Sequence, residues 1–157
     1  MALMWKDKWK SIQSKFDTCT KECLIAYRSD EKCKDSIEAV ISDIWNLRDW
    51  LKEDPSVRIP DQDILKFIDT PEAYNIRACG DVEMVTKHFI AKNPKYQNAE
   101  LVWEGNHNHP SGYPIVFKVI IREKEIPENA TIYEDAWELG RRAIEEWRVF
   151  LTKHRLI

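Results

Sequence analysis

A polar stripe on the segment 74–90 carries the side chains whose types and spacing could do chemistry. Arg77, Asp81 and His88 recur at steps of four and seven residues, which places them on one side of a helix that turns about 100° per residue. A carboxylate beside an imidazole can orient the ring or favour its charged form, and an imidazole can transfer protons near neutral pH. We therefore predict that His88 and Asp81 are catalytic residues.

Basic side chains near this stripe could bind an anionic group. Arg48 and Asp49 lie in the apolar segment 47–51 of a preceding predicted helix, which an antiparallel arrangement would bring beside the stripe. Arginine and lysine neutralise phosphate and donate charge-assisted hydrogen bonds to it. The predicted ligand is RNA or a phosphate-bearing small molecule, bound by Arg48, Asp49, Arg77 and Lys87. The same residues could instead form a salt-bridge network at the edge of a helical bundle, and the sequence leaves both interpretations open.

Apolar side chains on the same segment predict which face of this helix packs on the core. Ala78, Val82, Val85 and Phe89 fall within a narrow arc, about a quarter turn from the polar stripe. The polar stripe is therefore expected at the rim of the core, where a side chain can be partly desolvated and still meet a ligand.

Helical periodicity recurs in four parts of the chain. Apolar residues at steps of three and four predict helices over residues 3–28, 35–54, 71–92 and 133–154. Residues 56–69 are predicted to form a loop with one short helical turn, because the apolar run there is brief. Residues 99–124 combine β-branched and aromatic side chains with a central turn-forming segment, which predicts a β-hairpin. The expected fold class is α+β, a predominantly helical bundle of about four helices with a β-hairpin inserted before the last helix.

Length and charge limit the classes of protein and partner. The 157 residues fit a single domain spanning residues 1–157. The formal net charge of −3 lacks the basic excess that drives duplex DNA binding. No apolar run is long enough to span a bilayer, and residues 1–10 contain no apolar leader segment. We therefore expect a cytoplasmic protein that binds neither duplex DNA nor a membrane.

The cysteines and histidines do not form a convincing metal site. Cys19 and Cys23 have a spacing compatible with zinc, but one pair supplies only half of a tetrahedral site. His107 and His109 lie in the predicted hairpin loop with no carboxylate or thiol nearby to complete a set. We therefore expect no metal and no cofactor. All four cysteines are expected to be reduced and buried as small apolar side chains, because a domain of this size does not need disulfides.

Two short motifs give the chain a resemblance to a known superfamily. The sequence LRDWL at residues 47–51 is followed by CGDVEMVTKH at residues 79–88. Together they resemble bacterial and phage proteins that pair an Arg-Asp-Trp helix with a Cys-x-Asp-x-x-Asn-x-x-Lys-His helix, and that we associate with the helical HEPN superfamily. Trp147, Phe150 and Leu151 match a Trp-x-x-Phe-Leu element in the closing helix of these proteins. The chain departs from the pattern at Met84, where the pattern has Asn.

The resemblance implies a function in conflict between bacteria and phages. Many HEPN proteins are dimeric RNases of toxin, defence or CRISPR systems. Their RNases pair Arg with His across four to six residues, whereas ten residues separate Arg77 from His88. The predicted function is therefore HEPN-like binding of RNA or a nucleotide in a toxin, defence or anti-defence system, with ribonuclease activity left open. The seven tryptophans and the resemblance together predict a homodimer.

A second function class fits the same sequence. The chain could be a non-enzymatic phage or bacterial interaction protein that inhibits a host defence protein or sequesters a signalling nucleotide. An exposed apolar patch combined with a structural polar network would favour this alternative. A concave pocket lined by Arg48, Asp81 and His88 would favour the first function.

Overall fold

The computed structural model describes residues 4–25, 31–88, 99–108, 114–121 and 132–157. The helical elements are α1 (Trp5–Cys19) with its π-helical continuation η1 (Thr20–Ile25), α2 (Glu31–Glu53), α3 (Asp61–Ile68), the 3-10 turn η2 (Pro71–Ala73), α4 (Tyr74–His88) and α5 (Ala136–Lys153). The strands are β1 (Ala99–Asn108), β2 (Pro114–Ile121) and β3 (Ile132–Asp135).

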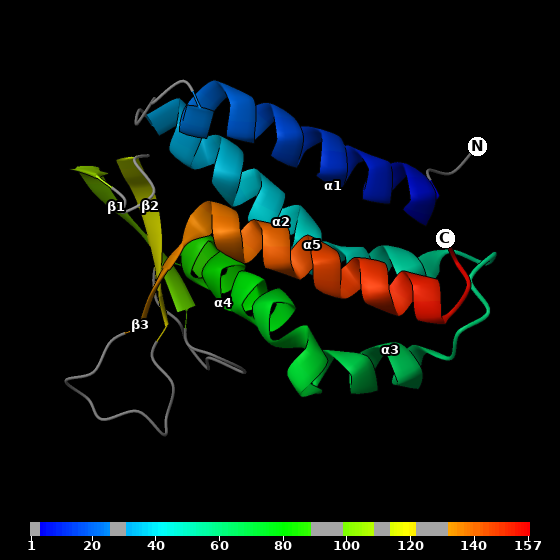
Figure 1. Ribbon diagram of the computed structural model, residues 1–157. Coiled ribbons are helices and arrows are strands. Elements are labelled where there is room, and N and C mark those ends of the chain that lie inside the picture. Colours follow the sequence, from blue (N-terminus) through cyan, green and yellow to red (C-terminus); the bar gives the residue numbers. More distant parts are fainter. Residues whose placement is uncertain (1–3, 26–30, 89–98, 109–113, 122–131) are drawn as a thin grey trace.

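The four long helices α1, α2, α4 and α5 lie alongside one another (Figure 1). α2 packs against both α1 and α4, and α4 also packs against α5. The strands lie at one end of these helices, where β1 contacts α4 and both β2 and β3 contact α5. α3 lies toward the other end, beside the C-terminal part of α5 (Figure 1).

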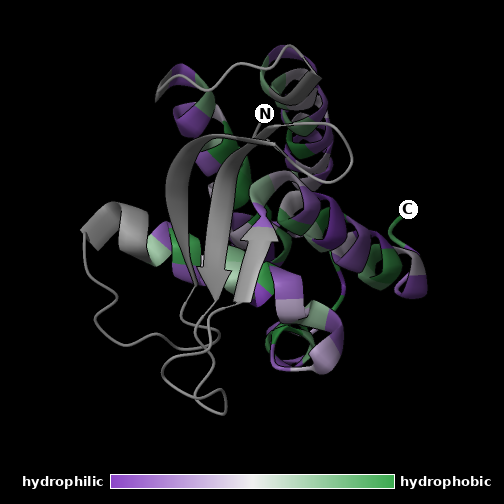
Figure 2. Cartoon of the chain, turned by 60° about the vertical axis from the view of Figure 1, so that its left-hand side comes forward, coloured by the Kyte–Doolittle hydropathy of each residue, from purple (hydrophilic) through white to green (hydrophobic). Residues whose placement is uncertain are grey.

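Large apolar side chains fill the space between the helices. Trp5, Ile12, Ile44 and Trp147 are each at most 1% exposed. Burying a side chain of this kind stabilises the fold by about 1.5–3 kcal/mol. The indole N–H of Trp147 donates a hydrogen bond to the carbonyl of Ile44 over 2.8 Å, so the polar atom of this core tryptophan is satisfied. Figure 2 shows hydrophobic (green) and hydrophilic (purple) residues on the same helices, as amphipathic packing requires.

The strands form one antiparallel sheet in the order β1-β2-β3. Ala99 is paired with Ile121 in the first ladder, and Ile121 is paired with Ile132 in the second. The chain then turns directly from β3 into α5 at Asp135. The carboxylate of Asp135 accepts hydrogen bonds from the backbone N–H groups of Trp137 and Glu138, at 2.7 and 3.2 Å, and so caps α5.

The fold class predicted from the sequence is wrong. In place of about four helices with an inserted hairpin, the described chain is predominantly helical with five α-helices, and its strands form a three-stranded sheet. The additional helix is α3, in the segment predicted to be mainly a loop. The additional strand is β3, which begins where the last helix was predicted to begin. Pairing with β2 is a non-local contact, so the local pattern of residues 132–135 could not show it.

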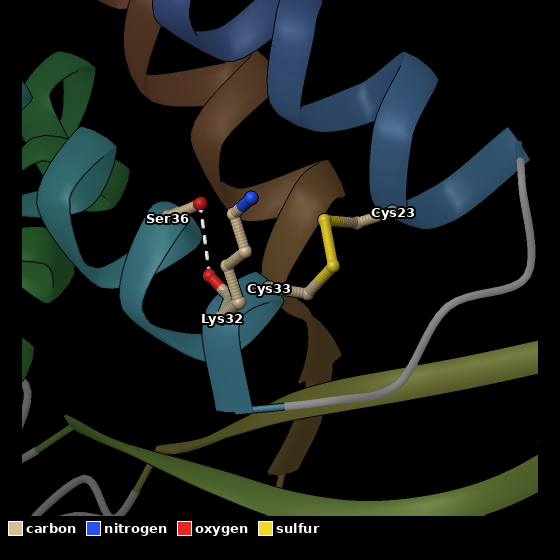
Figure 3. The surroundings of a disulfide bond; sticks show 4 residues. All are labelled: Cys23, Lys32, Cys33 and Ser36. Carbon is tan, nitrogen blue, oxygen red and sulfur yellow. Dashed lines mark hydrogen bonds between the residues drawn. A yellow bond between two sulfur atoms is a disulfide. The ribbon is translucent and has the colours of Figure 1, made fainter.

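The prediction of four reduced cysteines is also wrong. Cys23 and Cys33 form a disulfide with an S–S distance of 2.09 Å and a Cα–Cα distance of 5.7 Å, whereas Cys19 and Cys79 are free and buried. Figure 3 shows this bridge joining the end of the first helical segment to the start of α2. The antiparallel packing of α1 and α2 brings the two cysteines together, and their spacing along the chain did not indicate it.

Among the described residues, no helix has both the length and the apolar character needed to cross a membrane.

Candidate functional site

The face shared by α2 and α4 is built around Trp45. A Cβ atom added to Gly80 would lie only 2.7 Å from Cδ2 of the Trp45 ring, so the indole packs directly on the backbone of α4. Only glycine permits this approach without a shift of the indole or of one helix. The guanidinium carbon of Arg48 lies 4.1 Å from the centroid of the same ring, within the range of a cation–π contact. Trp45 therefore fixes the position of Arg48 relative to α4.

Arg48 is held on this face but is not fully engaged. Its side chain is 24% exposed, and its Nη2 lies 3.8 Å from a carboxylate oxygen of Asp49. The other oxygen of Asp49 lies 3.1 Å from Nζ of Lys52, so this half-exposed carboxylate is shared between two cations. Nε of Arg48 has no hydrogen-bond partner among the described residues. Arg48 and Asp49 are neighbours on α2, and the unpartnered Nε of Arg48 is itself buried, so only the remaining part of this side chain can meet a ligand.

Asp81 lies deeper than the rim position expected for it. It is 1% exposed, on the turn of α4 that follows Gly80, so a ligand in solvent cannot touch it. Asp81 and His88 are separated by about 10 Å along the helix axis, because each residue adds about 1.5 Å of rise. A direct hydrogen bond between them is therefore not favoured by helix geometry, and Asp81 could act only as a positioning residue.

Arg77 makes its described contacts away from Arg48. It is 9% exposed, and its Nη1 donates hydrogen bonds to the carbonyls of Ile68, at 2.7 Å, and of Thr70. These carbonyls lie at the end of α3 and just after it. Arg77 therefore links the end of α3 to the first turn of α4.

Lys87 and His88 are the last residues of α4. The side chains of these two residues, and that of Val85, lie outside the described part of the structure, as does Phe89 altogether. Of the apolar arc predicted to face the core, Ala78 and Val82 are at most 1% exposed, as predicted. By helical geometry, Lys87 lies seven residues beyond Gly80 and so on nearly the same face of α4.

Two carboxylates near this face were not identified from the sequence. Glu83 is 7% exposed and accepts hydrogen bonds from the Ser42 hydroxyl and the Asn46 amide of α2, both at 3.0 Å. This buried polar cluster ties α2 to α4 and corresponds to the structural interpretation of the polar residues. Its signal in the sequence was the pair Ser42 and Asn46, which lie one turn apart on the predicted helix 35–54.

Glu146 of α5 is the second carboxylate, and it caps the start of α4. It accepts hydrogen bonds from the backbone N–H of Asn75 at 2.7 Å and of Ile76 at 3.1 Å. Burial raises the pKa of Glu146 to about 7, although the hydrogen bonds from Asn75 and Ile76 and the charge of Arg77 act in the opposite direction. The packing of α5 against α4 positions this group, so no local motif indicates it.

Searches of models of known protein families, of curated proteins and of solved structures found no match to this chain. In the described residues, no group of three or more His, Cys, Asp or Glu side chains could hold a metal ion. The chemistry of the α2–α4 face therefore has to be argued from its own geometry.

Proposed function

We propose that the α2–α4 face binds a phosphate group of RNA or of a nucleotide, in a cytoplasmic, HEPN-like homodimer that acts in a bacterial or phage conflict system. The observation that carries this proposal is the fixed position of Arg48. Its guanidinium lies over Trp45, and Trp45 is in turn seated on Gly80 of α4.

A fixed guanidinium suits phosphate because its donors are arranged in a rigid, planar fork. Contact with Trp45 restricts the side chain before a ligand arrives, so less conformational entropy is lost on binding. The Arg48 side chain is 24% exposed, so it is partly open to solvent, although its Nε is buried. A charge-assisted hydrogen bond of this kind contributes about 1.5–3 kcal/mol.

Lys87 and His88 extend the proposed site along α4. The backbone places Lys87 on nearly the same face of the helix as Gly80, roughly 10 Å further along the axis. In this proposal His88 is the group that would transfer a proton if the bound RNA is cleaved.

The test is to measure binding of a fluorescently labelled single-stranded RNA oligonucleotide to the wild type and to Arg48→Met. We expect the substitution to weaken binding by tenfold or more, because it removes the charge and the donors but keeps an apolar side chain over Trp45. His88→Ala should abolish any cleavage of the RNA while changing the free energy of unfolding by no more than about 1 kcal/mol.

Arg58→Met is the matched control, because Arg58 is exposed and lies outside this face. It should bind RNA almost as the wild type does. Equal RNA affinities of the wild type, Arg48→Met and Arg58→Met would contradict the proposed site. A large loss of stability in His88→Ala with normal binding per folded molecule would instead support a structural network.

The buried positions of Asp81, Arg77 and Glu83 favour a second candidate function. These residues serve the packing of α4 against its neighbours, as expected for a non-enzymatic interaction protein. Such a protein would inhibit a defence protein or sequester a signalling nucleotide. The RNA experiment separates the two candidates, because a sequestering protein binds nucleotides without cleaving RNA and an inhibitor binds neither.

A further inference from the structure

A groove between α3 and the end of α5 has the features of a small-molecule site. Its volume is about 400 Å³, which falls within the usual range for ligand pockets. Its lining combines the apolar side chains of Phe67, Val149 and Phe150 with the polar side chains of Lys66, Lys153 and His154. None of these residues belongs to the α2–α4 face. We propose that this groove is a separate binding site for a nucleoside monophosphate.

Stacked aromatic rings form part of the groove wall. The rings of Phe67 and Phe150 are stacked with centroids 4.3 Å apart, and the imidazole of His154 lies 4.4 Å from the ring of Phe150. Phe67 is only half-buried, and Val149 beside it is 57% exposed. A flat heterocyclic ring entering the groove would extend this stack and cover apolar surface that now faces solvent.

Side chains of both charges line the groove, and they favour a flat ligand that carries both an anionic group and a hydrogen-bond donor. Hydrogen bonds from its own backbone N–H and from the Thr70 hydroxyl, together with the charge of Lys153, lower the pKa of Glu72. Lys66 on α3 and Lys153 on α5 both line the groove. They can bind a phosphate group. Asp63 and Glu72 also line the groove, and their carboxylates can accept hydrogen bonds from an exocyclic amino group. A nucleotide whose base carries an amino group can bind the two lysines through its phosphate and the two carboxylates through its amino group.

The groove is attached to a rigid part of the molecule. Phe67 and Phe150 both contact the fully buried Trp147, with ring centroids 5.5 and 5.7 Å away. Thr70, which also lines the groove, donates a hydrogen bond from its hydroxyl to the carbonyl of Phe67 over 2.6 Å. This part of the lining is thus held in place without a ligand, which lowers the cost of binding.

The experiment is isothermal titration of the full chain with adenosine 5′-monophosphate. We expect binding that weakens by tenfold or more in the double variant Lys66→Met/Lys153→Met, whose two side chains are exposed and can be replaced without loss of folding. Lys10→Met, an exposed position on α1, is the control and should bind as the wild type does. Adenosine, inorganic phosphate and benzoate should each bind at least tenfold more weakly than the monophosphate.

Two results would overturn the proposal. One is a double variant that binds as many monophosphates per chain as the wild type and with the same affinities, or a wild type that shows no binding at millimolar concentration. The other is benzoate binding as tightly as the monophosphate, which would show an apolar groove without selection for a nucleotide.

The Arg48→Met variant keeps this inference distinct from the proposed function. If both sites exist, the wild type binds two monophosphates per chain, and each variant retains one. If Arg48→Met loses all monophosphate binding while the double variant binds as the wild type does, the groove proposal is overturned and the α2–α4 site remains. The reverse pattern supports the groove and removes the α2–α4 site.

Discussion

At the scale of single residues, Glu146 is a partly buried carboxyl group whose pKa is strongly raised. It is partly buried between α5 and the start of α4, and its two oxygens accept hydrogen bonds from Asn75 and Ile76. Burial raises its pKa to about 7 from the ordinary value of 4.5. Because the folded state then holds the proton more tightly than the unfolded state, folding is favoured at low pH and loses this contribution as the pH rises from about 4.5 to about 7.

We predict that the free energy of unfolding of the wild type falls by on the order of 1–2 kcal/mol between pH 5 and pH 8, after allowance for solvent screening of this partly exposed group. In Glu146→Gln the fall should be smaller, because the neutral amide keeps an acceptor oxygen and does not titrate. Urea unfolding of both proteins at pH 5 and pH 8 measures the difference. Subtracting the change in the variant from the change in the wild type removes the contribution of the histidines, which both proteins share. A wild type that gains stability relative to the variant as the pH rises would show that the N–H groups of α4 outweigh burial.

The residue scale also shows how much of the candidate site the sequence could reveal. Helical spacing correctly placed Ala78 and Val82 on the buried face. Helical spacing does not predict how deeply a side chain is buried. Asp81 was expected at the rim but is buried, because neighbouring elements cover that side of the helix. Gly80 was an unused signal. A glycine inside a helix costs about 1 kcal/mol relative to alanine, and here it permits the contact with Trp45.

At the scale of elements, periodicity predicted the long helices well and the short elements poorly. The prediction of residues 71–92 corresponds to η2 and α4, which span Pro71–His88, and the prediction of residues 35–54 corresponds to α2. α3 has eight residues, too few for an isolated helix to be stable, so packing rather than local preference forms it. Its residues Ile64 and Ile68 are at most 2% exposed.

The Cys23–Cys33 disulfide gives the next prediction, at the junction of η1 and α2. Its two sulfur-bearing side chains are at most 2% exposed, and they are ten residues apart in the chain. Closing a loop of this length restricts the unfolded chain and stabilises the fold by roughly 2–3 kcal/mol in the chain-entropy model. We therefore expect dithiothreitol to lower the melting temperature of the wild type by several degrees.

The variant Cys23→Ser/Cys33→Ser is the control for this experiment. It should melt near the temperature of the reduced wild type and should not respond to dithiothreitol. A melting temperature of this variant equal to that of the oxidised wild type would show that the disulfide contributes nothing to stability. Mass measurement after alkylation of the unfolded chain should find two reactive cysteines, Cys19 and Cys79, before reduction.

At the scale of the whole molecule, six of the seven tryptophans pack within one chain, and the side chain of the seventh, Trp103, lies outside the described part of the structure. Trp5, Trp9, Trp45, Trp137 and Trp147 are all less than 9% exposed, and Trp50 is half-buried against the same core. The number of tryptophans therefore no longer argues for a dimer. The exposed large apolar side chains of the described residues are Met4, Leu65, Val149 and Ile157, which do not belong to one element.

The proposed homodimer is consequently expected to form without burying the described tryptophans further. Light scattering at micromolar concentration should give a mass of twice 18.6 kDa. Dilution should return the mass to that of one chain without a red shift of tryptophan emission, because the core of each chain is complete by itself. A mass of one chain at every concentration would remove the homodimer from the proposed function. A red shift that accompanies dissociation would show instead that the helices pack fully only in the dimer, since a buried indole that meets water emits at longer wavelength.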